Sequence, residues 1–160
     1  MSFPDTDPYA ELIRRLEDVS TALNRVSAEH PSGDAWSLKD DEGWSAHDVL
    51  AHMRASDDIL IPRIYQLLTR DNPPLPAFDE RRWAEIAGYG EVPAEAIFAR
   101  IVIRWFELMQ ILRRLPADSW QRSGVHEVNG EITLEQIVNH LVGHAEEHLA
   151  QIESLLSTAQ

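Results

Sequence analysis

Four long amphipathic segments constrain this chain more than any other feature of its sequence. In each segment, apolar residues recur at spacings of three and four, which is the period of one face of an α-helix. The segments run from about residue 7 to 29, 45 to 69, 93 to 115 and 134 to 156. Each apolar face must be buried against other helices, so the pattern predicts an all-α fold, a four-helix bundle. We expect residues 1–160 to form one such domain.

Several residues at the ends of these segments are typical helix starts. Pro8 suits the first position of the first helix, because its missing N–H is not needed there. Ser45 with Asp48, and Thr133 with Gln136, each have the spacing of a capping box. These signals support the predicted beginnings of the first, second and last helices.

The connections between the helices are long, so the bundle cannot be a simple up-and-down one. Residues 70–92 and 116–133 are long crossover connections. The first contains a short extra helix, from about Asp79 to Ala87. The second contains a small hairpin, Val125 to Thr133, in which Asn129-Gly130 is typical of a type I′ turn.

Charge and cysteine content exclude several classes of function. The chain has 27 Asp and Glu against 14 Lys and Arg, so its net charge is −13. An acidic surface repels phosphate backbones and anionic lipids, and we expect no nucleic-acid partner and no membrane partner. The N-terminus lacks a signal-peptide pattern and no apolar run would span a bilayer, which predicts a cytoplasmic protein. With no Cys, disulfides, thiolate metal ligands and a cysteine nucleophile are excluded.

The positions of the histidines point to chemistry. His144 and His148 occupy successive core positions of the last predicted helix and share one face of it. A buried neutral imidazole needs partners for one donor and one acceptor, so two in an apolar face are costly unless something uses them. A divalent cation would use both, since histidines four residues apart on a helix can bind one zinc ion. On spacing alone, hydrogen-bonded structural histidines are an equally good interpretation.

His52 favours the metal site. It flanks the inward-facing positions Val49, Met53 and Ser56 of the second helix and can therefore face the bundle interior. Three histidines from two helices are a typical partial ligand set of a catalytic metal, with positions left for water or substrate. Residues 144–148 also match the H-x-x-E-H pattern of one peptidase class, but too little chain follows them for the further ligand that this class needs.

Other candidate residues have two interpretations each. Arg63, on the inward face of the second helix, either orients a substrate carboxylate or pairs with an acidic residue of the bundle. His140 is interpreted as a helix-face residue rather than a donor to the site. His126 is interpreted as an exposed loop residue rather than part of the pocket mouth. Glu146 and Glu147 fit a solvated helix face.

Two motifs carry a resemblance to a known family. Trp44-Ser45 opens a helix that carries Val49-Leu50-Ala51-His52, and Gly130-x-x-Thr133 precedes His140-Leu-Val-Gly-His144-Ala-Glu-Glu-His148-Leu-Ala-Gln-Ile152. Over about residues 44–152 the chain resembles the DinB-like, or YfiT-like, superfamily. The resemblance implies a metal-binding four-helix bundle of unusual connectivity, often a homodimer. Its ligands would be one histidine of the second helix and two of the last, which fall on His52, His144 and His148.

The resemblance also implies a range of activities. The family includes thiol S-transferases that use bacillithiol or mycothiol, mycothiol-dependent isomerases, and proteins described as metal-dependent hydrolases. Our leading hypothesis is a zinc- or nickel-dependent S-transferase, in which the metal activates a low-molecular-weight thiol that attacks an electrophilic substrate. A metal-dependent hydrolase that activates water would use the same residues, and a non-catalytic, stress-associated metal-binding protein is the third hypothesis. The sequence does not separate transfer from hydrolysis, because neither needs a residue that the other lacks.

Overall fold

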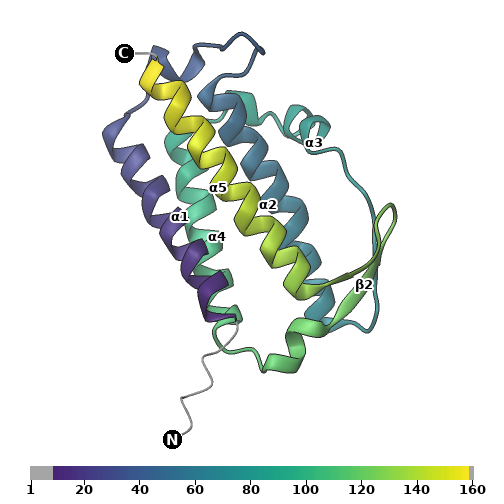
Figure 1. The fold of residues 1–160 in the computed structure, drawn as a ribbon. Helices are drawn as coiled ribbons and strands as arrows, with labels where there is room; N and C mark the ends of the chain where they lie inside the picture. The colour runs from purple at the N-terminus through teal and green to yellow at the C-terminus, as the bar shows by residue number, and fades with distance from the viewer. Residues whose placement is uncertain (1–8, 159–160) are drawn as a thin grey trace, which may run out of the picture.

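The predicted helices form the bundle, as a computed structural model that describes residues 9–158 shows (Figure 1). The all-α four-helix bundle is confirmed, and the place predicted for Pro8 lies outside the described residues. Within residues 9–158, no helix has the length and apolarity needed to cross a bilayer. The four long helices are α1 (Ala10–Glu29), α2 (Ala46–Thr69), α4 (Ala94–Leu112) and α5 (Leu134–Thr158).

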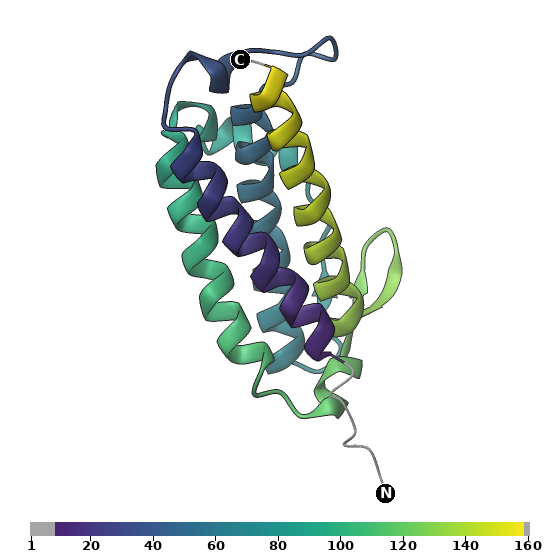
Figure 2. The ribbon, with the colours of Figure 1, turned by 60° about the vertical axis from the view of Figure 1, so that its left-hand side comes forward.

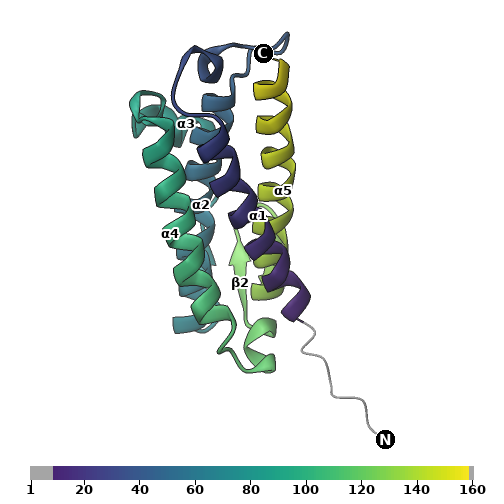
Figure 3. The same ribbon diagram turned by 90° about the vertical axis from the view of Figure 1, so that its left-hand side faces the viewer.

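The order of the helices around the bundle differs from their order in the sequence. Helix α1 packs against α4 and α5, and α2 packs against the same two helices. Helices α1 and α2 therefore lie diagonally across the bundle, as do α4 and α5, whereas α2 and α4 are neighbours. In Figures 1, 2 and 3, α1 and α5 run in one direction while α2 and α4 run in the other. Because α2 and α4 are parallel neighbours, the chain between them must return along the bundle, and this explains the first long connection.

The connections contain the predicted short helix and hairpin, and one strand that we did not predict. That strand lies in a proline-rich stretch within the connection of residues 70–92. The N–H of Val125 donates to the carbonyl of Pro73 at 2.9 Å, and that of Glu127 to the carbonyl of Leu75 at 3.1 Å. A proline segment can pair only at a sheet edge, where its missing donors face away. The elements are α3 (Glu80–Ile86), β1 (Pro74–Leu75), parallel to β2 (Ser123–His126), and β3 (Gly130–Thr133), antiparallel to β2.

The hairpin turn is longer than predicted. His126 pairs with Gly130, so three residues rather than two form the turn, and the type I′ prediction is wrong. The reason is the ring of His126, whose Nδ1 accepts the backbone N–H groups of Val128 and Asn129 at 3.2 and 3.1 Å. Gly130, with φ of 73°, then returns the chain to the second strand, as in three-residue hairpin loops.

A glycine places the hairpin against the end of α2. A Cβ atom on Gly124 would lie 2.8 Å from a methyl carbon of Leu67 and 2.8 Å from the carbonyl oxygen of Pro73. Both distances are too short for any larger residue without movement of the backbone or of Leu67. Gly124 therefore lets β2 lie close to α2, and this brings the turn residue His126 to the side of the bundle.

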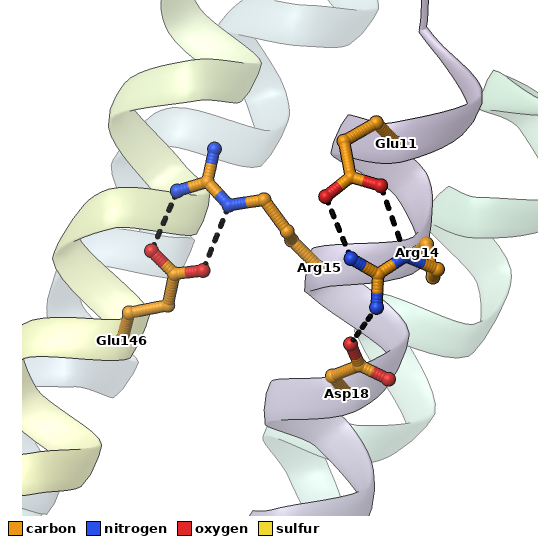
Figure 4. Close-up of polar contacts among 5 residues, drawn as sticks. All are labelled: Glu11, Arg14, Arg15, Asp18 and Glu146. Atoms are coloured by element: carbon orange, nitrogen blue, oxygen red, sulfur yellow. Dashed lines mark hydrogen bonds and ion pairs between the residues drawn. The ribbon is translucent and has the colours of Figure 1, made fainter.

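A bidentate ion pair joins α1 to α5 (Figure 4). The Nε and Nη2 atoms of Arg15 donate to the two carboxylate oxygens of Glu146 at 2.8 and 2.6 Å. We had predicted that Glu146 lies on a solvated helix face. Instead, it faces α1 and pairs with Arg15. The pair is half-exposed, so we expect about 1 kcal/mol or less from it. The neighbouring Arg14 pairs with Glu11 and Asp18 of its own helix.

One buried carboxyl in the bundle has no good partner. Asp57 of α2 is 4% exposed, and neither its Oδ2 nor the Nε1 of the nearby Trp105 has a hydrogen-bond partner among the described residues. Burial raises the pKa of Asp57 from 3.8 to about 7, while Trp105 and Arg104 offset only part of this change. The folded protein therefore holds a proton on Asp57 at a pH where the unfolded chain has lost it.

Removing this carboxyl should change how stability depends on pH. Between pH 4 and pH 7 the unfolded chain binds fewer protons at Asp57 than the folded chain, so the contribution of this carboxyl to the free energy of unfolding falls as pH rises. In Asp57→Asn that loss is absent. The variant should therefore gain about 1 to 4 kcal/mol relative to wild type between pH 4 and pH 8, measured by urea unfolding with chelator present. The exposed Asp41→Asn should show no such change, and an Asp57→Asn difference independent of pH would contradict this account.

Candidate metal centre

The antiparallel packing of α2 and α5 brings three of the predicted histidines together. His52 comes from α2, and His144 and His148 come from successive turns of α5. One ring nitrogen of each lies within 4.8 Å of a ring nitrogen of both others. The Nε2 atoms of His52 and His144 are 3.0 Å apart, and the hydroxyl of Ser56 is 3.5 Å from the same His144 nitrogen. All three histidines are half-buried.

The donor set fits a divalent cation better than it fits a hydrogen-bonded cluster. Two neutral imidazoles can share only one hydrogen bond, so the facing Nε2 atoms of His52 and His144, with the ring of His148 beside both, leave lone pairs that a cation would use. Zinc binds imidazole nitrogen at about 2.0–2.1 Å, so two tetrahedral ligands would lie about 3.4 Å apart. The observed 3.0 Å separation is close to this value. Structural histidines held by hydrogen bonds to one another, the alternative from the sequence, leave these nitrogens poorly satisfied.

Burial keeps the cluster in the form that binds metal. It lowers the pKa of His52, and the neighbouring His148 lowers it further. Burial, again the main cause, together with His148 and His52, lowers the pKa of His144 to about 3. These two rings are therefore neutral at pH 7, and neutral imidazole is the ligand form.

Gln151 orients the third histidine. The Nδ1 of His148 lies 2.9 Å from the side-chain Oε1 of Gln151, three residues further along α5. An amide oxygen accepts, so Nδ1 carries the proton and Nε2 is left with a free lone pair. Such a second partner fixes ring orientation in metal sites. The sequence places Gln151 on the inward face of the helix, but we had assigned it no role, since the rotamers that join the two side chains are not visible in the spacing.

A cavity of about 420 Å³ opens beside the cluster, between α2, α3 and the loop before α2. His52 lines it, and the ring of Trp44 packs edge-on against His52, with centroids 6.1 Å apart. The guanidinium of Arg81 lies over Trp44 at 5.1 Å. One side of the cluster is thus open to a small molecule through a partly aromatic passage.

A second cavity of about 510 Å³ lies further along α2, next to the hairpin and the start of α5. Arg63 lines this cavity and not the first one. It forms no ion pair with any acidic residue of the described chain, so its expected pairing within the bundle is not seen. His140 also lines the cavity, and its exposed ring is 5.9 Å from that of His144.

The exposure of two side chains near the site, His126 and Glu147, was predicted from the sequence. His126 is 8% exposed, so its prediction as an exposed loop residue is wrong, because its ring fills the hairpin turn. Glu147, the glutamate of the H-x-x-E-H pattern, is exposed and does not join the histidine cluster. A peptidase of that class would need this glutamate at the metal site.

Removing one histidine should abolish stoichiometric metal binding. The full-length wild type, purified without a histidine tag, should hold about one divalent ion per chain. His148→Ala leaves two ligands, so metal affinity should fall more than about 100-fold. The matched control is His140→Ala, one helical turn before the cluster, which should retain the metal. Metal analysis after gel filtration checks this, and equal content in wild type and His148→Ala would refute the site.

Removing the orienting amide should have a smaller effect. Gln151→Ala leaves His148 unchanged, but the Nδ1–H group of its ring loses its hydrogen-bond acceptor. We expect metal affinity to fall about 10-fold, and at most 100-fold, because the lost partner does not touch the metal. Competition with a chromophoric chelator gives the affinities. An unchanged affinity would show that Gln151 has no orienting role.

Comparison with known proteins identifies the family and agrees with the fold. Residues 9–152 match the family model of the DinB superfamily. The chain is 27% identical to OB0413 of Oceanobacillus iheyensis, over 98% of this chain and 92% of that protein, and 26% identical to YfiT of Bacillus subtilis, over 89% and 81%. Both carry the name "putative metal-dependent hydrolase". The solved structure of YfiT, described as having an unusual four-helix bundle topology, superposes with a TM-score of 0.83 at 23% identity, over 97% of this chain and 89% of that one. The chain belongs to the DinB superfamily.

Proposed function

We propose that the protein is a metal-dependent enzyme that transfers a small thiol to an electrophilic substrate. His52, His144 and His148 would hold the divalent ion, zinc or nickel. The observation that supports this proposal is the convergence of three half-buried imidazoles, with one ring nitrogen of each within 4.8 Å of the others. A structural zinc site is closed by four protein ligands. In the described chain no fourth His, Asp or Glu joins the cluster, so a bound ion would keep positions for an exogenous ligand.

The residues around the ion favour an anionic ligand. A divalent ion lowers the pKa of a coordinated thiol or water and so favours the nucleophilic anion at neutral pH. His52 and His144 are held neutral by burial and add no negative charge that would compete with such an anion. Gln151 holds the ring of His148 in one orientation, and Trp44 covers one edge of His52.

One feature favours transfer. Two cavities lie near the cluster, the first lined by His52 and the second by His140, whose ring is 5.9 Å from that of His144, so that two reactants have room. Because the chain has no Cys, the thiolate of a transfer reaction would come from a small molecule. The net charge of −13 also disfavours large polyanionic substrates.

Hydrolysis is the second candidate, and the names of OB0413 and YfiT favour it. It would use the same three histidines with water in place of the thiol. The expected homodimer, the identity of the thiol and the cytoplasmic location stay predictions.

A thiol-transfer assay tests the proposal. With chlorodinitrobenzene, the thiol sulfur forms a bond to the ring carbon, chloride leaves with its bonding electrons, and the thiol proton goes to the buffer. Metal-loaded wild type should accelerate this reaction with at least one small bacterial thiol. Chelator, or His144→Ala, should lower the enzymatic rate at least about 100-fold, because the nucleophile is no longer activated. His30→Ala, at the end of α1, should keep the wild-type rate.

The contrary outcomes point to the other hypotheses. Thiol-independent hydrolysis of a nitrophenyl ester that is lost in His144→Ala would replace transfer by hydrolysis. Full metal occupancy with no turnover of any thiol or ester tested would contradict both and favour the non-catalytic hypothesis.

A further inference from the structure

The second cavity combines an apolar wall with unused hydrogen-bond donors. It lies between α2, the segment after β1, the hairpin and the start of α5. Leu60, Phe78, Ile132 and Ile137 line it with apolar atoms, and Phe78 is 48% exposed although it is large and apolar. A cavity with such walls and a few convergent polar groups is typical of small-molecule sites.

Arg63 is the cation of this cavity. One of its Nη atoms donates to the backbone carbonyl of Pro76, and its buried Nε has no partner among the described residues. Burial lowers the pKa of its guanidinium, and Glu80, which lies at a distance without forming an ion pair, partly offsets this change. Several other half-buried arginines, such as Arg15 and Arg104, are paired with carboxylates. Arg63 thus lines the cavity without an ion pair to any carboxylate of the described chain.

His126 supplies a second donor in a fixed tautomer. Its Nδ1 accepts two backbone N–H groups, from Val128 and Asn129, so the proton of the neutral ring is on Nε2. Burial and the nearby charge of Arg63 lower the pKa of His126 and keep the ring neutral. Among the described residues Nε2 has no hydrogen-bond partner, and the ring lines the cavity. Gln136 lines it too, with its Oε1 engaged by the Thr133 N–H, which leaves the amide NH₂ as its free end.

We propose that this cavity binds the carboxylate of a small monocarboxylic substrate with an apolar body. Arg63 would be the ionic anchor and His126 Nε2–H the second donor. Guanidinium groups match the planar carboxylate well. Glu80 and Glu131 also line the cavity, so with Arg63 its charged side chains sum to −1, and this disfavours dianions such as phosphate esters. The role in catalysis rests on the proposed function, because His140 links this cavity to the cluster at His144.

Benzoate is a suitable probe, because it joins one carboxylate to an apolar ring. Benzamide has the same shape without charge, and phenylphosphonate carries a larger and more negative group. Binding is measured by calorimetry on the full-length chain, with metal and after chelator treatment, and by the ¹⁵N shift of His126 Nε2. Benzoate should bind with and without metal, shift the His126 resonance, and bind at least 10-fold more tightly than benzamide or phenylphosphonate.

Variants of one arginine decide the assignment. Arg63→Met should weaken benzoate binding at least 10-fold and leave benzamide unchanged, while Arg63→Lys, which keeps the charge, should recover part of the loss. The matched control is Arg70→Met, at the exposed end of the same helix, which removes the same charge and should have no effect. Circular dichroism and metal content should be unchanged in all three variants.

The outcomes separate this proposal from the proposed function. Benzoate affinity that is equal in wild type and Arg63→Met overturns the site. Binding that requires the metal, disappears in His144→Ala and leaves the His126 resonance unshifted also overturns it, since the carboxylate then lies on the metal. Arg63-dependent binding in a protein that shows no turnover supports the site while the enzymatic proposal fails.

Discussion

The antiparallel packing of α2 on α5 is the interaction on which the rest of the site depends. Each helix alone presents histidines that water would solvate. Packed together, the helices half-bury His52, His144 and His148 with their ring nitrogens facing one another. The order of the helices around the bundle makes α2 and α5 neighbours, although more than sixty residues separate their nearest ends in the sequence. Because an α-helix has about 3.6 residues per turn, His144 and His148 lie on the same face of α5, and this face packs against the His52 face of α2.

Two cavities extend this arrangement along α2. The first is lined by His52 of the cluster, and the second is lined by His140, whose ring is 5.9 Å from that of His144. The long connection between α2 and α4 forms one wall of each cavity, because α3 and the segment before it lie over the side of the bundle. The hairpin completes the second cavity, and Gly124 sets how closely it approaches α2. The unusual connectivity is thus the physical origin of the open space around the histidines.

Much of the fold and the cluster could be predicted from the sequence, because both depend on helical periodicity. The period gave the four helices and placed three histidines on inward faces. Features that depend on tertiary contacts were missed. Strand β1 exists only because β2 lies beside a proline segment. The hairpin turn has three residues rather than the predicted two, because the ring of His126 accepts backbone N–H groups of the turn. The partner of His148 was missed since Gln151 is identified by a rotamer, and the partner of Glu146 since Arg15 belongs to a helix distant in sequence.

X-ray absorption at the zinc and nickel edges tests the central claim most directly, on the full-length chain purified without a histidine tag. The account predicts three imidazole nitrogens at about 2.0–2.1 Å for zinc, with at least one further light atom from solvent. It predicts two imidazoles, or no bound metal, in His52→Ala. A bound metal with no imidazole ligands, or a spectrum that does not change in His52→Ala, would contradict it.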